Sequence, residues 1–205
     1  MIAGVVSTGI RMHVLGRELP LSMAYRAGFS GRGLLAGRFD TLLTSQLLTR
    51  DHFMFTSMIL SLAVMLGGYE MLAGSKRAAF VALAGAIAGP GIVTLVLGAG
   101  SALHNDFATR TLSTLDYGAS AITAAAGGAL VATLGRRWLR WGAVVFVVGG
   151  VVLHHQMADW EHLVACPVGF GLASLLNRGS RPAATAVKAL RILRAARSAG
   201  ANASR

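Results

Sequence analysis

Residues 78–103 read AAFVALAGAIAGPGIVTLVLGAGSAL, and this stretch decides the fold because it contains no charged side chain. A helix needs about 20 predominantly apolar residues to cross a bilayer, so the stretch is long enough to span one. Four further apolar stretches bounded by charge lie at 53–73, 117–135, 141–155 and 162–176. The sequence predicts an all-α, polytopic transmembrane helix bundle of about five spans, although the last two stretches reach span length only with their flanks.

The composition of the whole chain agrees with a membrane location. Of the 205 residues, 54% are hydrophobic and only 13% are charged, and the mean hydropathy is +0.61. Soluble domains carry roughly 25% charged residues, so a water-soluble fold would lack solubilising charge. The 26 glycines suit closely packed membrane helices, because lipid gives no hydrophobic drive for helix association.

The net charge of +11 raises the question of nucleic-acid binding. The basic residues flank the apolar runs and do not alternate with aromatic side chains, which is the pattern of topology determinants. We therefore expect membrane lipid, and no nucleic acid, as a partner. Cys166 is the only cysteine, which excludes a disulfide framework and a cysteine-based metal site.

Charge divides the chain into a basic N-terminal segment at 1–43, a transmembrane domain at 44–176 and a basic tail at 177–205. The first segment has five arginines against two acids, and it is interpreted as peripheral, as a vestigial span or as an organellar targeting peptide. Apolar residues recur at helical spacing over 187–193 of the tail. The tail is interpreted as a basic amphipathic helix on an anionic membrane surface or as a solvated end.

Basic loops also predict an orientation. Threading five spans places Lys76–Arg77, the turn at 136–140 and the tail on one face, and the turns at 104–116 and 156–161 on the other. By the positive-inside rule, the first face is expected to be cytoplasmic in a bacterial plasma membrane, or to face the matrix in a mitochondrial inner membrane. The N-terminal arginines disagree, and an absent or vestigial first span would explain them.

Two chemically capable side chains begin spans on the non-cytoplasmic face. Ser120 follows the sequence DYGA, and His162 follows DWE, so both are expected at a similar shallow depth. A hydroxyl and an imidazole at matched depth are the minimum for nucleophilic catalysis with histidine as the general base. The competing interpretation is a capping or back-bonded serine and a histidine that only hydrogen-bonds a neighbour.

The turn before the last span contains several side chains that can bind a metal. His154, His155, Asp159 and His162 surround this turn, but they lack the HExxH-type helical spacing of a zinc site. We therefore expect no metal and no cofactor.

Five short segments follow one another along the chain. They are LTS (43–45), GGYE (67–70), LAGSKR (72–77), DYGAS (116–120) and DWEH (159–162), the last followed by Ala165 and Gly169. Their order resembles the rhomboid superfamily of intramembrane serine proteases, most closely the divergent rhomboid-like membrane proteins of actinobacteria. The first loop and second helix of that superfamily show a similar run, "LTS…span…E-x-x-x-G-x-x-R". Its nucleophile turn has a similar "D-V-G-x-S" or Gly-x-Ser-Gly sequence, and its histidine helix carries a small-xxx-small face.

The resemblance covers about residues 43–176 and implies a Ser–His dyad without a third carboxylate. Ser120 would be the nucleophile and His162 the general base, and the substrates would be transmembrane helices rich in small residues. The resemblance places Gly118, Ala119 and Ala121 at the nucleophile turn. It implies structural roles for Glu70, Gly74, Arg77, Ala165 and Gly169.

This chain departs from the family at the oxyanion site. An ungapped alignment from Thr44 to Glu70 places Met54 and Met58 where active rhomboids have a histidine and an asparagine. A thioether cannot donate a hydrogen bond, and loss of one oxyanion donor typically lowers the rate about 10²–10³-fold. Ala121 also replaces the glycine after the serine.

Three functions therefore remain open. The first is a rhomboid-type intramembrane serine endopeptidase. The second is a catalytically silent rhomboid-like protein that binds transmembrane clients or serves as a subunit of a membrane complex. The third is a small transporter or channel, which is disfavoured because the spans contain no ionisable residue except near their ends.

Overall fold

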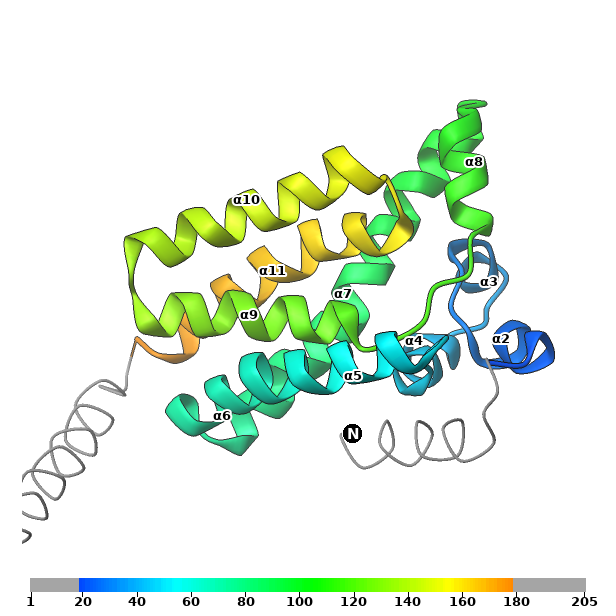
Figure 1. Cartoon of the computed structure of the whole chain (residues 1–205). Helices are drawn as coiled ribbons and strands as arrows, with labels where there is room; N and C mark the ends of the chain where they lie inside the picture. The colour runs from blue at the N-terminus through cyan, green and yellow to red at the C-terminus, as the bar shows by residue number, and fades with distance from the viewer. Residues whose placement is uncertain (1–18, 179–205) are drawn as a thin grey trace, which may run out of the picture.

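The computed structural model describes residues 19–178, and within them the chain is helical without a β-strand (Figure 1). The predicted all-α class is therefore confirmed. Short helices come first and longer ones follow. The elements are α2 Leu21–Ala27, α3 Gly31–Leu35, α4 Thr41–Thr44, η1 Ser45–Leu47, α5 His52–Ser61, the π-helix η2 Leu62–Gly67, α6 Gly68–Ala73, α7 Ser75–Ala102, α8 Asp106–Ser113, α9 Ser120–Leu134, α10 Arg137–His154 and α11 Met157–Leu176.

Three helices among the described residues are long and apolar enough to cross a membrane, which is consistent with an integral membrane protein. They are the continuous helix His52–Ala73 formed by α5, η2 and α6, together with α7 and α10. Helix α9 is apolar but has only 15 residues. Helix α11 has 20 residues, with Asp159, Glu161 and His162 near its start.

Local sequence sets where these helices begin and end. The Asp51 carboxylate caps α5 by accepting the Met54 N–H at 2.8 Å, which satisfies a donor left free at a helix start. Gly74 separates α6 from α7 with φ +88°, a conformation that a side chain would oppose. Gly135, with φ +66°, ends α9 in the left-handed conformation typical of a helix C-terminus.

The core is a seam of small residues between α9 and α11, with α7 against both. A Cβ atom added at Gly169 would overlap the carbonyl oxygen of Ala125, and one added at Gly128 would overlap that of Cys166. The two backbones therefore touch where glycine faces them. Because lipid gives no hydrophobic drive for helix association, such close approach supplies the packing energy.

Helix α10 lies on the outside of this seam (Figure 1). Among its residues only Val147 is buried. Its exposed apolar side chains include Trp138, Val145, Phe146 and Leu153, which are all more than half exposed.

The short helices α2–α4 pack against the bundle as well. Phe29 is fully buried among α7, α8 and α11 residues, and its backbone pairs with Asp116 in an isolated bridge. The Thr44 hydroxyl donates to the Ala27 carbonyl at 2.9 Å. The interpretations of residues 1–18 and of the tail from 179 onward concern parts of the chain outside the described residues.

Candidate functional site

Ser120 and His162 line the same cavity, which has a volume of about 540 Å³. Ser120 begins α9, and His162 lies in the second turn of α11. Helices α5, η2 and α10 supply the remaining walls. The structure thus brings the two residues of the predicted dyad to one hollow between helices.

A short non-helical segment, 114–119, delivers Ser120 to the cavity. Asp116 is fixed at its backbone, since its N–H donates to the Phe29 carbonyl at 2.8 Å and its carbonyl accepts from the Phe29 N–H at 3.0 Å. Gly118 has φ +99° and its N–H donates to the Ser45 carbonyl at 2.8 Å. Helix α9 starts only after this turn, and the Ser120 Oγ is buried without a hydrogen-bond partner.

The imidazole of His162 rests against α10. Its ring stacks on the Phe146 ring with centroids 6.4 Å apart and planes inclined by 22°. Since the Ser120 Oγ has no partner, no hydrogen bond joins it to His162 in this structure. Both residues line the cavity. Catalytic hydrogen bonds often form only when a substrate is bound.

The two methionines predicted at the oxyanion position lie directly against the nucleophile turn. The Met58 Sδ accepts the Ala119 N–H at 2.9 Å. A Cβ atom added at Gly118 would stand 2.6 Å from Met54 Cε and 3.1 Å from Met58 Sδ, so only glycine fits there. The N–H groups of Gly118 and Ala119 are therefore both occupied, by the Ser45 carbonyl and by sulfur.

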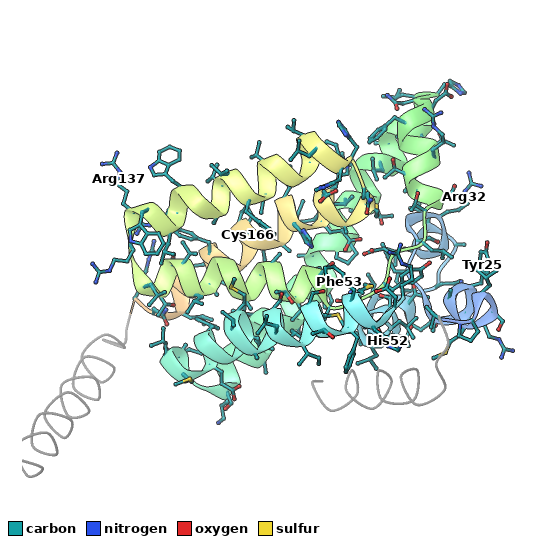
Figure 2. All side chains as sticks on the ribbon, in the orientation of Figure 1. Tyr25, Arg32, His52, Phe53, Arg137 and Cys166 are labelled. Atoms are coloured by element: carbon teal, nitrogen blue, oxygen red, sulfur yellow. The ribbon has the colours of Figure 1, made fainter. Side chains whose placement is uncertain are left out.

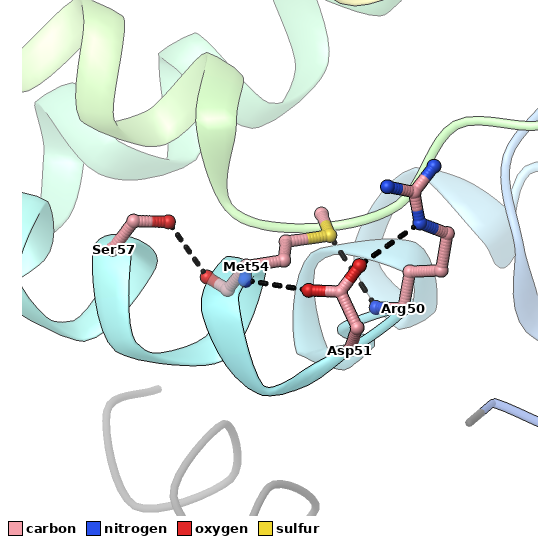
Figure 3. A network of polar contacts seen from close by, with 4 residues as sticks. All are labelled: Arg50, Asp51, Met54 and Ser57. Carbon is pink, nitrogen blue, oxygen red and sulfur yellow. Dashed lines mark hydrogen bonds and ion pairs between the residues drawn. The ribbon is translucent and has the colours of Figure 1, made fainter.

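A charged cap holds Met54 in place (Figure 3). Asp51 accepts from the Met54 N–H at 2.8 Å and from Arg50 Nε at 3.1 Å. The hydrogen bond from Met54, followed by that from Arg50, lowers the pKa of Asp51. The Arg50 N–H in turn donates to Met54 Sδ at 3.3 Å, and the Ser57 hydroxyl donates to the Met54 carbonyl at 3.1 Å.

Sequence reasoning missed the hydroxyls of this wall. The cavity-facing stripe of α5 and η2 recurs at spacings of three, four and seven residues, which is one helical face. The spacing of these residues from Met54 along the sequence could have indicated that they share its helical face. The stripe consists of Met54, Ser57, Met58, Ser61 and Met65.

Two acidic side chains near the site were not predicted. Glu161 is 1% exposed and its Oε1 has no hydrogen-bond partner in the described part of the chain, while Asp116 is half-buried. Burial raises the pKa of Asp116 to about 7, against the lowering effect of hydrogen bonds from Tyr117 and Glu161. The nearby charge of Asp159 raises it further. In the sequence these acids only marked polar turns.

The residues for which structural roles were predicted lie outside the cavity lining. Glu70 accepts from the Ser75 hydroxyl at 2.6 Å, just beyond the turn at Gly74. Arg77 donates to Asn177 Oδ1 at 3.1 Å, and Asn177 Nδ2 donates to Thr133 Oγ1 at 3.0 Å. This network ties the start of α7 to the ends of α9 and α11.

The small residues of the two motifs belong to the seam. Ala165 and Gly169 are buried on α11, and Ala121 is fully buried on α9. A Cβ atom added at Gly89 of α7 would lie 3.3 Å from that of Ala165 and 3.4 Å from that of Ala121. Ala121 therefore packs against α7 and does not face the cavity.

The histidines of the α10–α11 turn form no metal cluster with their neighbours in residues 19–178. His154 Nδ1 lies 3.9 Å from Asp159 Oδ1. His155 ends α10 with φ +57°, while His162 points into the cavity. The four residues considered as ligands are thus divided between a helix end and the cavity.

Comparison with protein-family models and with curated protein sequences finds no match to this chain. The rhomboid resemblance therefore rests on the order of the motifs.

Proposed function

We propose that the protein is a rhomboid-like intramembrane serine endopeptidase of about five spans, with Ser120 as nucleophile and His162 as general base. The observation that carries the proposal is the shared cavity, which is lined by both a buried, unpartnered serine hydroxyl and an imidazole. An unpartnered buried hydroxyl is costly to keep, and a nucleophile that awaits its substrate explains why this one persists.

The arrangement of the helices supports the span count and the orientation. The shorter helix α9 is enclosed by α5, η2, α7, α10 and α11, so it does not need the length of a lipid-facing helix. The basic turn with Arg137 lies at the end of the bundle opposite the start of α9 (Figures 1 and 2). With that basic end cytoplasmic or in the matrix, Ser120 and His162 would lie near the other membrane surface.

The chemistry needs no metal or cofactor. Ser120 Oγ attacks the carbonyl carbon of a peptide bond, and His162 accepts the hydroxyl proton. The tetrahedral intermediate collapses as the C–N bond breaks, and His162 gives its proton to the leaving amine. Water then attacks the acyl-serine ester, with His162 passing a proton from the water to Ser120 Oγ, and a new carboxylate is released.

The substrate would be an unwound part of a transmembrane segment. The cavity is mostly apolar and lies between the face of α5 and η2 and the inner face of α10. Since α10 is held to the bundle by few buried side chains, it offers a lateral entrance from lipid. The glycines at 127 and 142 leave room in the walls for a client backbone.

The test is covalent labelling of the purified full-length protein by a fluorescent fluorophosphonate. We expect labelling at Ser120, identified by mass spectrometry, and its loss in Ser120→Ala. Ser61→Ala is the matched control, because Ser61 lines the same cavity and should leave labelling unchanged. Labelling that persists unchanged in Ser120→Ala would refute the proposal, as would failure of the wild type to react.

The second candidate is a silent client-binding protein, and the contact between Met58 and Ala119 favours it. A sulfur atom accepts a backbone N–H beside the nucleophile, which removes a donor that an oxyanion would use. This candidate predicts that a transmembrane peptide with a photoreactive group crosslinks to cavity residues of α10 and remains uncut. Cleavage of that peptide by the wild type but not by Ser120→Ala would contradict it.

A further inference from the structure

The cavity lined by Ser120 and His162 extends along the bundle toward its basic end. On α9 the lining runs from Ser120 to Val131, and on α5 and η2 it runs from Met54 to Met65. At a rise of 1.5 Å per residue, the part along α9 is about 16 Å long. One leaflet of a bilayer has a hydrocarbon depth of about 15 Å, half that of the whole core. The cavity is therefore about as long as the acyl region of one leaflet is deep.

The half of the cavity toward the basic end is apolar and takes no part in the proposed chemistry. Its lining there consists of Met65, Val131, Trp138 and Leu139. Trp138 and Trp141 are 71% and 60% exposed, and tryptophan is enriched where the membrane meets water. This end of the cavity is therefore expected at the level of the lipid headgroups.

Two exposed arginines, Arg136 and Arg137, directly precede Trp138 in the turn between α9 and α10 (Figure 2). Within the described part of the chain neither guanidinium forms an ion pair with a carboxylate, and α9 and α10 contain no acidic residue. Arg140 differs, because its guanidinium lies 5.6 Å from the centre of the Phe170 ring. Arginine binds phosphate through two parallel hydrogen bonds, so this turn is suited to a phosphate group.

The width of the cavity limits what can enter it. The volume of about 540 Å³, divided by the length of about 16 Å, gives a mean cross-section of about 34 Å². An α-helix about 10 Å across has a cross-section of about 80 Å², so a helix of a partner does not fit, whereas a single extended chain does. The apolar lining favours a hydrocarbon chain, and the two arginines favour a headgroup with net negative charge. An anionic phospholipid combines these two properties.

We propose that the cavity is a binding site for an anionic phospholipid, whose phosphate accepts hydrogen bonds from Arg136 and Arg137 and whose acyl chain extends along the cavity toward Ser120. The site itself does not depend on the protease function. Its consequence rests on that proposed function, because the acyl chain occupies the space that an unwound client needs. The lipid is then a competitor that a client must displace.

The experiment uses the full-length protein in phosphatidylcholine nanodiscs. They contain, at low mole fraction, a phosphatidylglycerol with a diazirine at the end of one acyl chain. After illumination, peptide mapping by mass spectrometry should place crosslinks on the cavity residues of α5 and α9. A phosphatidylcholine that carries the same diazirine should give at least fivefold fewer crosslinks there, because a basic residue beside an anionic headgroup contributes about fivefold to affinity.

Charge variants separate a built site from a basic membrane face. Arg137→Gln should lower cavity crosslinking by phosphatidylglycerol about fivefold, and the double variant Arg136→Gln/Arg137→Gln about 25-fold. Lys76→Gln is the matched control, because Lys76 is an exposed basic residue of the same predicted membrane face and does not line the cavity. It should stay within about twofold of the wild type, since it lies away from the proposed headgroup.

Three results would overturn the proposal. The first is equal cavity crosslinking by the two lipids, and the second is a loss in Lys76→Gln as large as that in Arg137→Gln, because the basic face would then attract lipid without a site. The third is crosslinks confined to exposed side chains such as Trp141 and Val145, which would describe lipid on the surface of α10 alone.

A further variant blocks the cavity and leaves every charge in place. A Cβ atom added at Gly127 would lie 3.5 Å from Met65 Sδ across the cavity, which is an ordinary contact distance. Gly127→Leu should therefore abolish crosslinks to residues 120–124, and their persistence would overturn the proposed path of the acyl chain. Should Gly127→Leu fail to fold, the variants of the two exposed arginines decide the proposal by themselves.

Fluorophosphonate labelling of Ser120 in the same nanodiscs tests the competition. Unlabelled phosphatidylglycerol should slow labelling of the wild type and have no effect on the double arginine variant, and labelling that it does not slow overturns the competition. A wild type that never labels contradicts the protease function alone, because crosslinking does not require activity. Normal labelling without crosslinks in the cavity overturns the lipid site alone.

Discussion

The two sides of the helical bundle are built differently. On one side, α9 and α11 meet backbone to backbone at Gly128 and Gly169. On the other, α10 buries only Val147 and leaves a cavity between itself and α5. Ser120 and His162 lie on the closely packed helices, but both face the loosely packed side. Small residues therefore give rigidity where helices touch and space where they do not.

This division suits a protein that receives a client from lipid. Helix association in a bilayer depends on close packing and hydrogen bonds, because lipid is as apolar as the helices. The seam can therefore carry most of the stability while α10 moves at low energetic cost. Function should be sensitive to changes at the cavity, and stability to changes at the seam.

The largest expected effect is on function, from His162→Ala. Removal of a general base typically lowers the rate about 10²–10⁴-fold, so fluorophosphonate labelling of Ser120 should fall by that factor while the melting temperature stays nearly constant. His155→Ala is the control, since His155 is exposed at the end of α10 and outside the cavity lining. Equal labelling in His162→Ala and the wild type would remove His162 from the proposed dyad.

The next largest effect is a loss of stability when a side chain is added at the seam between α9 and α11. Gly169→Ala forces a Cβ atom into the Ala125 carbonyl, and overpacking against backbone should cost about 3 kcal/mol or more. The same substitution at Gly142 on α10 meets nothing within 4 Å and should leave stability unchanged or raise it by about 0.5–1 kcal/mol. Thermal unfolding of both variants measures the difference. Similar stability of the two variants would mean that the two sides do not differ in packing.

Much of the fold could be predicted from apolar runs, but helix limits could not. The stretch at 117–135 predicted the third span, yet α9 begins at Ser120 because Gly118 adopts φ +99° and donates to Ser45. Helix α10 begins at Arg137, before its apolar run at 141. Charged residues at a membrane edge can belong to the helix, and a hydropathy pattern does not include them in the predicted span.

In the candidate site, too, some features follow from local sequence and others from contacts between distant segments. The places of Ser120 and His162 at two span starts predict a matched depth, and the two residues line one cavity. That Met58 would accept a hydrogen bond from Ala119, and Gly118 donate one to Ser45, depends on contacts between distant segments. Residue spacing along one helix cannot reveal such contacts. Ser57 was within reach of spacing alone, three residues after Met54.

A smaller effect is expected on the loosely packed side, when a hydrogen-bond donor is introduced at the oxyanion position. Met58→Asn replaces the sulfur that accepts from Ala119 with an amide that can donate to an oxyanion. One such donor is worth about 10²-fold when ideally placed, so we expect at least a tenfold gain in the labelling rate. Met65→Asn, on the same cavity-facing stripe but two turns away, is the control and should show no gain. A gain common to both variants would indicate greater cavity polarity and not an oxyanion donor.

The smallest effect concerns the cap of α5, the wall opposite α10. Asp51→Ala removes the acceptor of the Met54 N–H, and loss of an N-cap costs roughly 0.5–2 kcal/mol. Because hydrogen bonds from Met54 and Arg50 lower the pKa of Asp51, its stabilisation is present above the unfolded value of 3.8 and is lost as the pH falls below it. The melting temperatures of Asp51→Ala and the wild type should therefore differ at pH 7, and the difference should shrink as the pH falls below 3.8. Asp51→Asn keeps a capping oxygen but no charge, so its melting temperature at pH 7 should lie between those of the wild type and Asp51→Ala. A constant difference between Asp51→Ala and the wild type across this range would show that the carboxylate charge does not contribute, and that α5 is held by packing alone.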